Sequence, residues 1–317
     1  MNSSMTNSTY DSLTKISTLN SKVNDSLILI YLTLMCVSYL FFLYFLTVIL
    51  TVFFSTVQIR ENPRYLLFVH MLVTDTIYLT LGIFLSLSTL YVPLYIPVPI
   101  CYILIITLST AFKVTPYNLA VMALERYVAI CFPLRHGELC TRHNSVVAIA
   151  VIWVIGFIPN IVDFAIMISN QKPNFFSLRF KCSKTIFINV PEQDIMRNVT
   201  NVLSFVLVGL VMVFTYIQIM LIALNFGSKN SLASKAGKTI MLHALQLLLC
   251  MTAFSHNITE VYFKEYLLAM ARINFLFFMC LPRSLSPLIY GLRDEMLRNY
   301  IKKFVLCYRL KVSPIVN

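Results

Sequence analysis

Glu125 and Arg126 stand side by side where a long apolar run comes to an end. The run begins at Val98 and contains a single charged residue, Lys113, before this pair, and apolar residues resume directly after Tyr127. A guanidinium next to a carboxylate can act as a switch if it exchanges one partner for another between two states of the protein. The alternative is a static interfacial pair whose arginine reaches toward the membrane surface and anchors a helix end.

No part of the sequence is typical of catalysis. No set of His, Cys, Asp and Glu residues has the spacing of a metal site, and no nucleophile stands beside a candidate base. We therefore predict that the chain is not an enzyme and has no metal site and no cofactor. The residues that require an explanation are the few charged side chains that lie within apolar stretches.

The composition indicates that these charges lie inside a membrane. Of the 317 residues, 58% are hydrophobic and only 12% are charged, whereas a soluble domain carries roughly a quarter charged residues. Because lipid offers the backbone no hydrogen-bond partners, apolar stretches of about 20 residues should cross it as helices. We predict an all-α membrane protein, a seven-transmembrane helix bundle within residues 27–291. Its spans are 27–54, 65–92, 98–124, 144–168, 199–226, 239–261 and 273–291.

The polar N-terminal segment 1–26 sets the expected orientation. It contains three glycosylation sequons, at Asn2, Asn7 and Asn24, which make sense outside the cell, although such triplets also arise by chance in Asn- and Ser-rich sequence. With this tail outside, most Lys and Arg residues fall on the cytoplasmic side, as the positive-inside rule requires. We expect a plasma-membrane protein with an extracellular N-terminus and a cytoplasmic C-terminus. Its net charge of +12 then suits anionic lipid better than nucleic acid.

Two of the eight cysteines lie outside in this topology. Cys101 is at the outer start of the third span and Cys182 is in the outer loop 169–198. Both face an oxidising space, so a single disulfide between them is plausible chemistry.

The C-terminal segment 292–317 follows a different pattern. Between 292 and 308, apolar residues recur every four positions and basic residues take the other face, which is typical of an amphipathic helix on the inner membrane surface. Cys307 at its end is either a palmitoylation site or a free cytosolic thiol.

Several motifs, in this order, resemble the rhodopsin-like G-protein-coupled receptors. Glu125-Arg126-Tyr127 closes the third span, Trp153 lies in the fourth and SPLIY (286–290) closes the seventh. Within that family, MALERYVAICFPL resembles the MAYDRYVAIC-PL signature of odorant receptors, and KAGKTIMLH (235–243) resembles their pattern at the start of helix six. ALERYVAICFPLRH and PLIYGLRD (287–294) are similar to the fish-type group called odorant receptor 131-2-like.

The resemblance implies a role for the opening pair. Glu125 would hold Arg126 at rest, and Arg126 would contact a heterotrimeric G protein, of the olfactory stimulatory type, once helix six moves away. The same machinery would include further residues of the cytoplasmic half, namely Tyr127, Tyr216, Lys235, Lys238, Pro287 and Tyr290.

A second pair is expected within the membrane, between Asp75 and Arg283. Asp75 lies ten residues from Tyr65, about 15 Å along a helix, and Arg283 lies eight residues from Gly291, about 12 Å. The two charges therefore sit at similar depth, and the family fold places helices two and seven side by side. An intramembrane charge requires a partner, so we expect a direct ion pair, either purely structural or part of a switch.

Lys113, near mid-depth of the third span, and several charged and polar residues near the outer helix ends suggest a ligand cup. For each residue alone, reaching toward the interface is the simpler explanation. Together they form a set with both signs of charge: Lys113, Asp163, His256, Asn257, Glu260 and Arg272.

Three functions are consistent with this pattern. By resemblance, the first is an odorant receptor that binds a small, water-soluble molecule within the bundle and activates a G protein. The second is a related receptor for a peptide or lipid, against which the short outer tail argues mildly. The third is a secondary transporter, but transporters typically contain internal repeats and helices broken by Gly and Pro, and this chain has no repeat and seven Gly.

Overall fold

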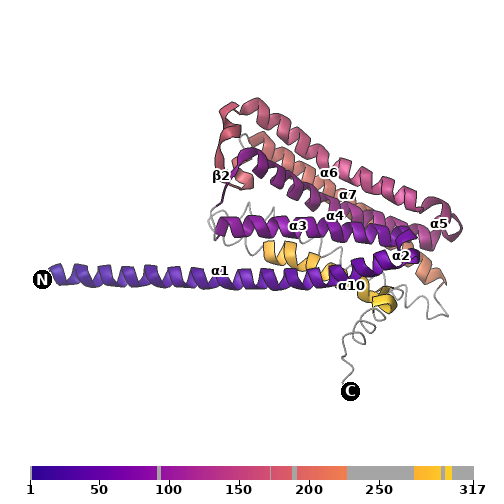
Figure 1. Cartoon of the computed structure of the whole chain (residues 1–317), viewed down its shortest axis with the longest axis horizontal. Coiled ribbons are helices and arrows are strands. Elements are labelled where there is room, and N and C mark those ends of the chain that lie inside the picture. The colour runs from indigo at the N-terminus through magenta and orange to yellow at the C-terminus, as the bar shows by residue number, and fades with distance from the viewer. Residues whose placement is uncertain are drawn as a thin grey trace, which may run out of the picture.

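The computed structural model of the chain describes residues 2–90, 94–171, 173–187, 191–226, 275–293 and 297–301. These residues are almost entirely helical (Figure 1). The long helices are α1 (Asn2–Ser55), α3 (Pro63–Leu90), α4 (Val98–Cys131), α6 (Arg142–Asn170) and α7 (Pro191–Phe226). Nearer the C-terminus, a π-helical turn, η4 (Phe275–Cys280), continues into α10 (Leu281–Arg293).

The prediction of membrane-spanning helices is confirmed for the first five spans. Within the described residues, five helical segments are long and apolar enough to cross a membrane: Asp25–Ser55, Pro63–Ser88, Val98–Cys131, Arg142–Asn170 and Pro191–Ile222. The predicted seventh span corresponds to η4 and α10. The predicted sixth span, 239–261, lies outside the described residues. The backbone of α1 is helical from Asn2, so the helix begins well before the apolar part at Asp25 that suits a membrane.

Prolines mark where several helices begin. Pro63, Pro133 and Pro191 are the first residues of α3, α5 (Pro133–Leu139) and α7. The first turn of a helix has no internal partner for its N–H groups, so the missing N–H of proline costs nothing there, and its fixed φ favours the helix. Each of these three prolines therefore sets the point at which the loop before it ends and the helix begins.

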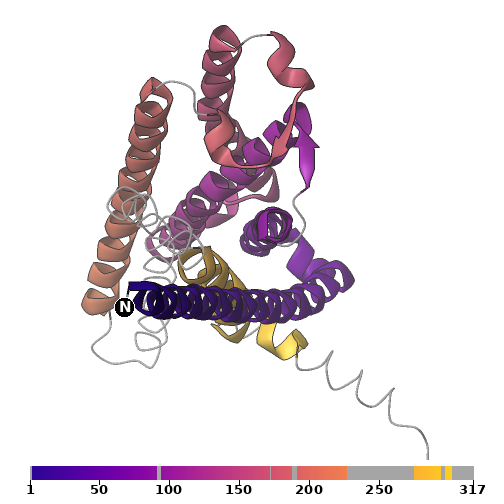
Figure 2. The ribbon, with the colours of Figure 1, turned by 90° about the vertical axis from the view of Figure 1, so that its left-hand side faces the viewer.

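Helix α4 occupies the middle of the bundle. It packs against α3, α6 and α7, whereas α10 packs against α1 and, more lightly, α3. The end-on view in Figure 2 shows α1 with α10 on one side of α3 and the α4, α6, α7 group on the other. Residues of α4 therefore face the interior along most of its length.

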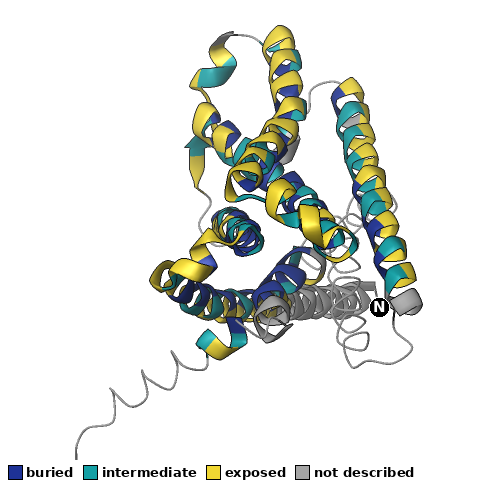
Figure 3. Cartoon of the chain, turned by 90° about the vertical axis from the view of Figure 1, so that its right-hand side faces the viewer, coloured by how far each residue is buried: buried dark blue, intermediate teal, exposed yellow. Residues whose placement is uncertain are grey.

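The distribution of side chains is that of a protein in lipid. Large apolar residues such as Leu34, Val154 and Leu203 are half or more exposed on the outward faces of α1, α6 and α7 (Figure 3). Two charged residues within the bundle are buried instead: Asp75 is 1% exposed and Arg283 is 6% exposed. Lipid accepts the apolar surface, and the interior of the bundle holds the charges.

A two-stranded sheet and a disulfide lie at one end of the bundle. Strands β1 (Tyr95–Pro97) and β2 (Arg179–Lys181) pair antiparallel, and the Cys101–Cys182 disulfide joins the start of α4 to the segment after β2. Two short 3₁₀ turns flank β2, η1 (Pro173–Ser177) and η2 (Lys184–Phe187). At the other end lie α5 and the short helix α2 (Val57–Glu61) (Figure 1).

Candidate functional site

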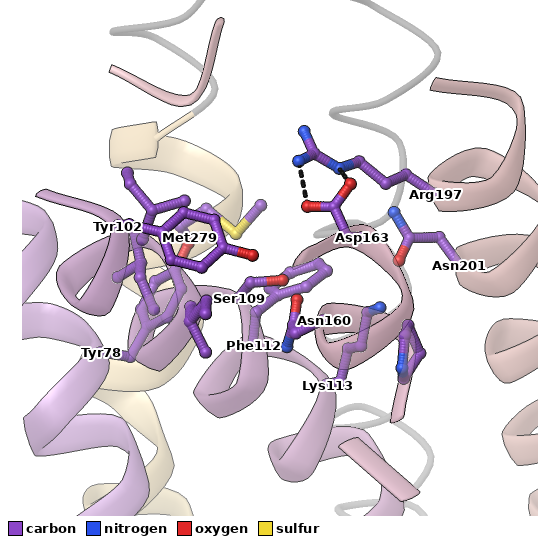
Figure 4. Close-up of a pocket in the computed structure, with 14 residues that line it drawn as sticks. Tyr78, Tyr102, Ser109, Phe112, Lys113, Asn160, Asp163, Arg197, Asn201 and Met279 are labelled. Atoms are coloured by element: carbon purple, nitrogen blue, oxygen red, sulfur yellow. Dashed lines mark hydrogen bonds and ion pairs between the residues drawn. The ribbon is translucent and has the colours of Figure 1, made fainter. Parts of the chain in front are cut away.

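A cavity of about 180 Å³ lies between α3, α4, α6, α7 and η4, toward the end of the bundle that carries the disulfide. Figure 4 shows Tyr78, Tyr102 and Met279 on one side of it and Asp163, Arg197 and Asn201 on the other. The cavity thus has an aromatic and apolar side facing a polar side. Its remaining walls are Ile105, Ile106, Leu108, Ser109, Phe112, Lys113, Pro159 and Asn160.

The polar side is organised by an ion pair between α6 and α7. Arg197 donates from Nε to Asp163 Oδ1 at 3.2 Å and from Nη2 to Asp163 Oδ2, and Gln193 Nε2 donates to Asp163 Oδ1 at 3.3 Å. Such a two-pronged contact holds the arginine in a fixed orientation. Asp163 was expected to line a ligand cup, and it does line this cavity. Its partner Arg197 was not recognised in the sequence, where it lies just before the predicted fifth span.

Lys113 and Asn160 come from the facing helices α4 and α6. Lys113, another expected cup residue, is 5% exposed and lines the cavity. Asn160 Nδ2 donates to Thr110 Oγ1 at 2.8 Å. The contact needs a close approach of the two helices, and Gly156 permits it, since a Cβ there would lie 3.3 Å from Thr110 Cγ2.

Asp75 and Arg283 form a buried ion pair directly beside this cavity. Arg283 Nη1 donates to Asp75 Oδ1 at 3.1 Å, and Thr115 Oγ1 donates to the same oxygen at 2.9 Å. The guanidinium carbon of Arg283 lies 3.8 Å from the centre of the Tyr78 ring and 6.0 Å from that of Phe112. Both rings also line the cavity. The pair expected from the sequence therefore shares two walls with the cavity.

A second polar cluster, which the sequence did not predict, ties α3, α4 and α6 together. Trp153 Nε1 donates to His70 Nε2 at 2.8 Å, and Asn118 Nδ2 donates to the Leu67 carbonyl oxygen at 2.9 Å. Since Nε2 accepts, Nδ1 of His70 carries the proton and donates to Asn118 Oδ1 at 3.3 Å. The single tryptophan of the chain therefore links α6 to α3 through His70.

At the opposite end of α4, the Glu125 carboxylate has a partner that the sequence analysis did not foresee. Glu125 Oε1 lies 3.0 Å from Nε2 of His136, which is in α5. The contact holds α5 against the end of α4. Burial, and then the charge of Glu125, raises the pKa of the neighbouring Cys140 thiol.

Arg126 and Tyr127 lie beside this contact. Arg126 is 8% exposed, and Tyr127 packs its ring against Phe132 at 5.7 Å and against Phe214 of α7 at 5.6 Å. The charged end of α4 is therefore enclosed by its own loop and by α7.

Comparison with known proteins places the chain in a family. Residues 46–290 match the model of the seven-transmembrane receptors of the rhodopsin family. This chain belongs to that family. Odorant receptor 131-2 of Danio rerio is 30% identical over 252 residues, which cover 78% of this chain and 77% of that protein. Olfactory receptor 5P53 of Mus musculus is 26% identical over 259 residues, 77% of this chain and 80% of that protein. Olfactory receptor 4M1 of Homo sapiens is 25% identical over 207 residues, 60% of this chain and 63% of that protein.

The family is one of membrane receptors rather than enzymes, so the receptor is a multi-pass membrane protein. Within it, η4 and α10 correspond to the seventh helix. Pro287 is a buried residue inside α10, Tyr290 lies in the same helix, and Tyr216 of α7 is 40% exposed.

Several expected residues of the receptor lie outside the described ranges. These are Lys235, Lys238, His256, Asn257, Glu260 and Arg272. The sequon residues Asn2, Asn7 and Asn24 lie on the backbone of α1. Most of the expected amphipathic helix 292–308 also falls outside, although 297–301 is helical and Tyr300 Oη donates to Gln58 Oε1 at 3.4 Å.

Proposed function

We propose that this receptor is an odorant receptor, which binds a small, water-soluble molecule in the cavity between α3, α4, α6 and α7 and activates a stimulatory heterotrimeric G protein. The observation that supports it best is the cavity itself. Apolar walls and a few oriented polar groups are the properties of a small-molecule site. The names of the related proteins point to the same ligand class.

The size of the cavity favours this proposal over a peptide receptor. About 180 Å³ suits a compact molecule, whereas sites for drug-sized ligands run from about 300 to 1,000 Å³. A secondary transporter is not supported, because the chain belongs to a receptor family.

The route from ligand to G protein begins at the shared walls. A ligand that displaces Tyr78 or Phe112 also changes the packing of Arg283, because the same rings cover its guanidinium. Arg283 is in α10, so the displacement reaches the seventh helix. A ligand shifts such an equilibrium only by binding one of the two arrangements more tightly.

The output of the switch is Arg126, at the far end of α4. In the proposed resting state the arginine is enclosed, as in this structure, where it is 8% exposed. On activation it contacts the G protein, and Lys235 and Lys238 extend the contact surface.

The test is the variant Arg126→Ala in cells that carry a cAMP reporter. At matched surface expression, both the basal cAMP signal and the response to a panel of water-soluble odorants should fall to the level of cells without receptor. Arg60→Ala, an exposed arginine of α2 at the same end of the bundle, is the control and should signal normally. A full response from Arg126→Ala would refute the role of Arg126.

We further propose that the N-terminus is extracellular, the C-terminus cytoplasmic and the receptor resident in the plasma membrane. The majority of basic residues on one side supports this orientation. Glycosidase treatment should reduce the apparent mass, and Asn2→Gln, Asn7→Gln and Asn24→Gln together should lessen that reduction. Antibody labelling of a C-terminal epitope in intact cells would contradict the orientation.

A further inference from the structure

The lining of the cavity contains buried polar atoms that have no hydrogen-bond partner in the described part of the chain and are available to a ligand. Among the described residues, three buried atoms of its lining have no hydrogen-bond partner: Tyr102 Oη, Arg197 Nη1 and Asn201 Oδ1. They comprise a hydroxyl, a cationic donor and a carbonyl acceptor. A buried polar atom without a partner costs about 1–3 kcal/mol, so a molecule that bonds to all three is strongly favoured over an apolar one.

Two of these three atoms are held in place before any ligand arrives. Arg197 is fixed by its two bonds to Asp163. The ring of Tyr102 is fixed between Phe164 and Phe187, each with its centre at 5.1 Å, so its hydroxyl is positioned by packing rather than by a hydrogen bond. A site with fixed polar groups loses little entropy when it binds.

The charge of the lining favours an anion. Its titratable side chains other than tyrosine are Lys113, Arg197 and Asp163, with a formal sum of +1. Both oxygens of Asp163 already accept hydrogen bonds from Arg197, so a ligand cation gains little there. A carboxylate, in contrast, accepts from arginine and tyrosine with charge-assisted bonds.

The carbonyl oxygen of Asn201 adds a second requirement. It accepts hydrogen bonds and cannot donate, so it repels a carboxylate oxygen and favours an O–H or N–H group next to it. The opposite side of the cavity is formed by Tyr78, Met279 and Phe112 and suits a short hydrocarbon body.

We propose that the ligand is a small carboxylic acid with a hydrogen-bond donor on the carbon next to its acid group and an apolar body, that is, a hydroxy acid or an amino acid. The carboxylate lies between Arg197 and the hydroxyl of Tyr102, which points into the cavity from the opposite side (Figure 4). The donor binds Asn201, and the body lies against Tyr78 and Phe112. This proposal rests on the proposed function, since it names the ligand class of the same cavity.

The test measures binding without signalling, on the purified full-length receptor in lipid nanodiscs. Three probes separate the two requirements: leucic acid has the acid and the hydroxyl, isocaproic acid lacks the hydroxyl, and the methyl ester of leucic acid lacks the charge. The concentration needed for a fixed rise in Tm should be lowest for leucic acid, because stabilisation by a ligand grows with its concentration relative to Kd. It should be about threefold to tenfold higher for isocaproic acid and about tenfold to a hundredfold higher for the ester.

Two variants assign the contacts to residues. Tyr102→Phe removes only a hydroxyl and keeps the ring packing, and it should weaken leucic acid about threefold to tenfold. Asn201→Leu should weaken leucic acid but leave isocaproic acid nearly unchanged, because that probe has no donor. Tyr44→Phe, on the exposed face of α1, is the matched control and should bind like the original protein.

The outcomes separate this proposal from the proposed function. If the ester binds as tightly as the acid, or if none of the three probes raises Tm, the acid proposal is wrong. The G-protein coupling in the proposed function is judged independently by the basal signal of Arg126→Ala, and ligand activation by the response to the odorant panel, neither of which requires an acid ligand.

Discussion

Removing Arg283 should destabilise the receptor more than removing any exposed arginine. In Arg283→Met, the Asp75 carboxylate, 1% exposed, loses its partner at 3.1 Å and keeps, among the described residues, the hydroxyl of Thr115. An uncompensated buried charge costs about 3–5 kcal/mol in soluble proteins, and scales for the centre of a membrane helix give about 2.5–3.5 kcal/mol. The lost contact with the Tyr78 ring adds about 0.5–2 kcal/mol.

We therefore expect Arg283→Met to lower the free energy of unfolding by about 3–5 kcal/mol. At roughly 2–3 °C per kcal/mol, the Tm of the purified receptor in nanodiscs should fall by about 6–15 °C. Asp75→Asn should cost less than Arg283→Met, because the guanidinium it leaves behind still lies over the Tyr78 ring. Arg60→Met, at an exposed position, should change Tm by less than about 1 °C.

The double variant decides whether the two residues act as a pair. Asp75→Asn with Arg283→Met leaves no buried charge at this place and should regain much of the lost Tm, with a coupling free energy of about 2 kcal/mol or more. Losses that simply add in the double variant, or single variants as stable as the original protein, would refute the reasoning.

Two other contacts, the disulfide and the tryptophan–histidine bond, should also contribute measurably to stability. Cys101→Ser and Cys182→Ser should each reduce surface expression, because each removes the same disulfide, which is worth about 2–5 kcal/mol. The double variant removes no further bond and should be no worse than either single variant. Flow cytometry of an N-terminal epitope measures surface expression, and additive losses would contradict the pairing. Trp153→Phe keeps the ring against its neighbours but leaves His70 Nε2 without its donor, so Tm should fall by an amount that corresponds to about 1–3 kcal/mol, whereas an unchanged Tm would show that the bond contributes nothing.

The sequence predicted the helices well because their signal is local. A run of about 20 apolar residues needs lipid whatever lies around it, and the span predicted at 144–168 is the helix Arg142–Asn170. The helical start of α1 at Asn2 was not predicted. Its first residues are rich in Ser, Thr and Asn, and these residue types have no strong preference for a helix.

The pairing of charges depended on information that is not local. Asp75 and Arg283 were matched by depth, and only the family resemblance brought their helices together. Asp163 was recognised as a candidate but Arg197 was not, because the two lie 34 positions apart and no periodicity joins them. The contact of Glu125 with His136 depends in the same way on how the chain turns back after α4.

Whether a ligand in the cavity activates the receptor is tested most directly by filling the cavity. Ser109 lines it, and Ser109→Phe occupies space that a ligand needs, whereas Ile103→Phe on the exposed face of the same helix leaves the cavity unchanged. The measurement is the cAMP dose response to any water-soluble odorant that activates the original receptor, at matched surface expression. We expect that Ser109→Phe raises the half-maximal concentration at least about tenfold, equivalent to about 1.4 kcal/mol of binding free energy, and that Ile103→Phe leaves it unchanged; equal dose responses of Ser109→Phe and the original receptor would contradict ligand binding in this cavity.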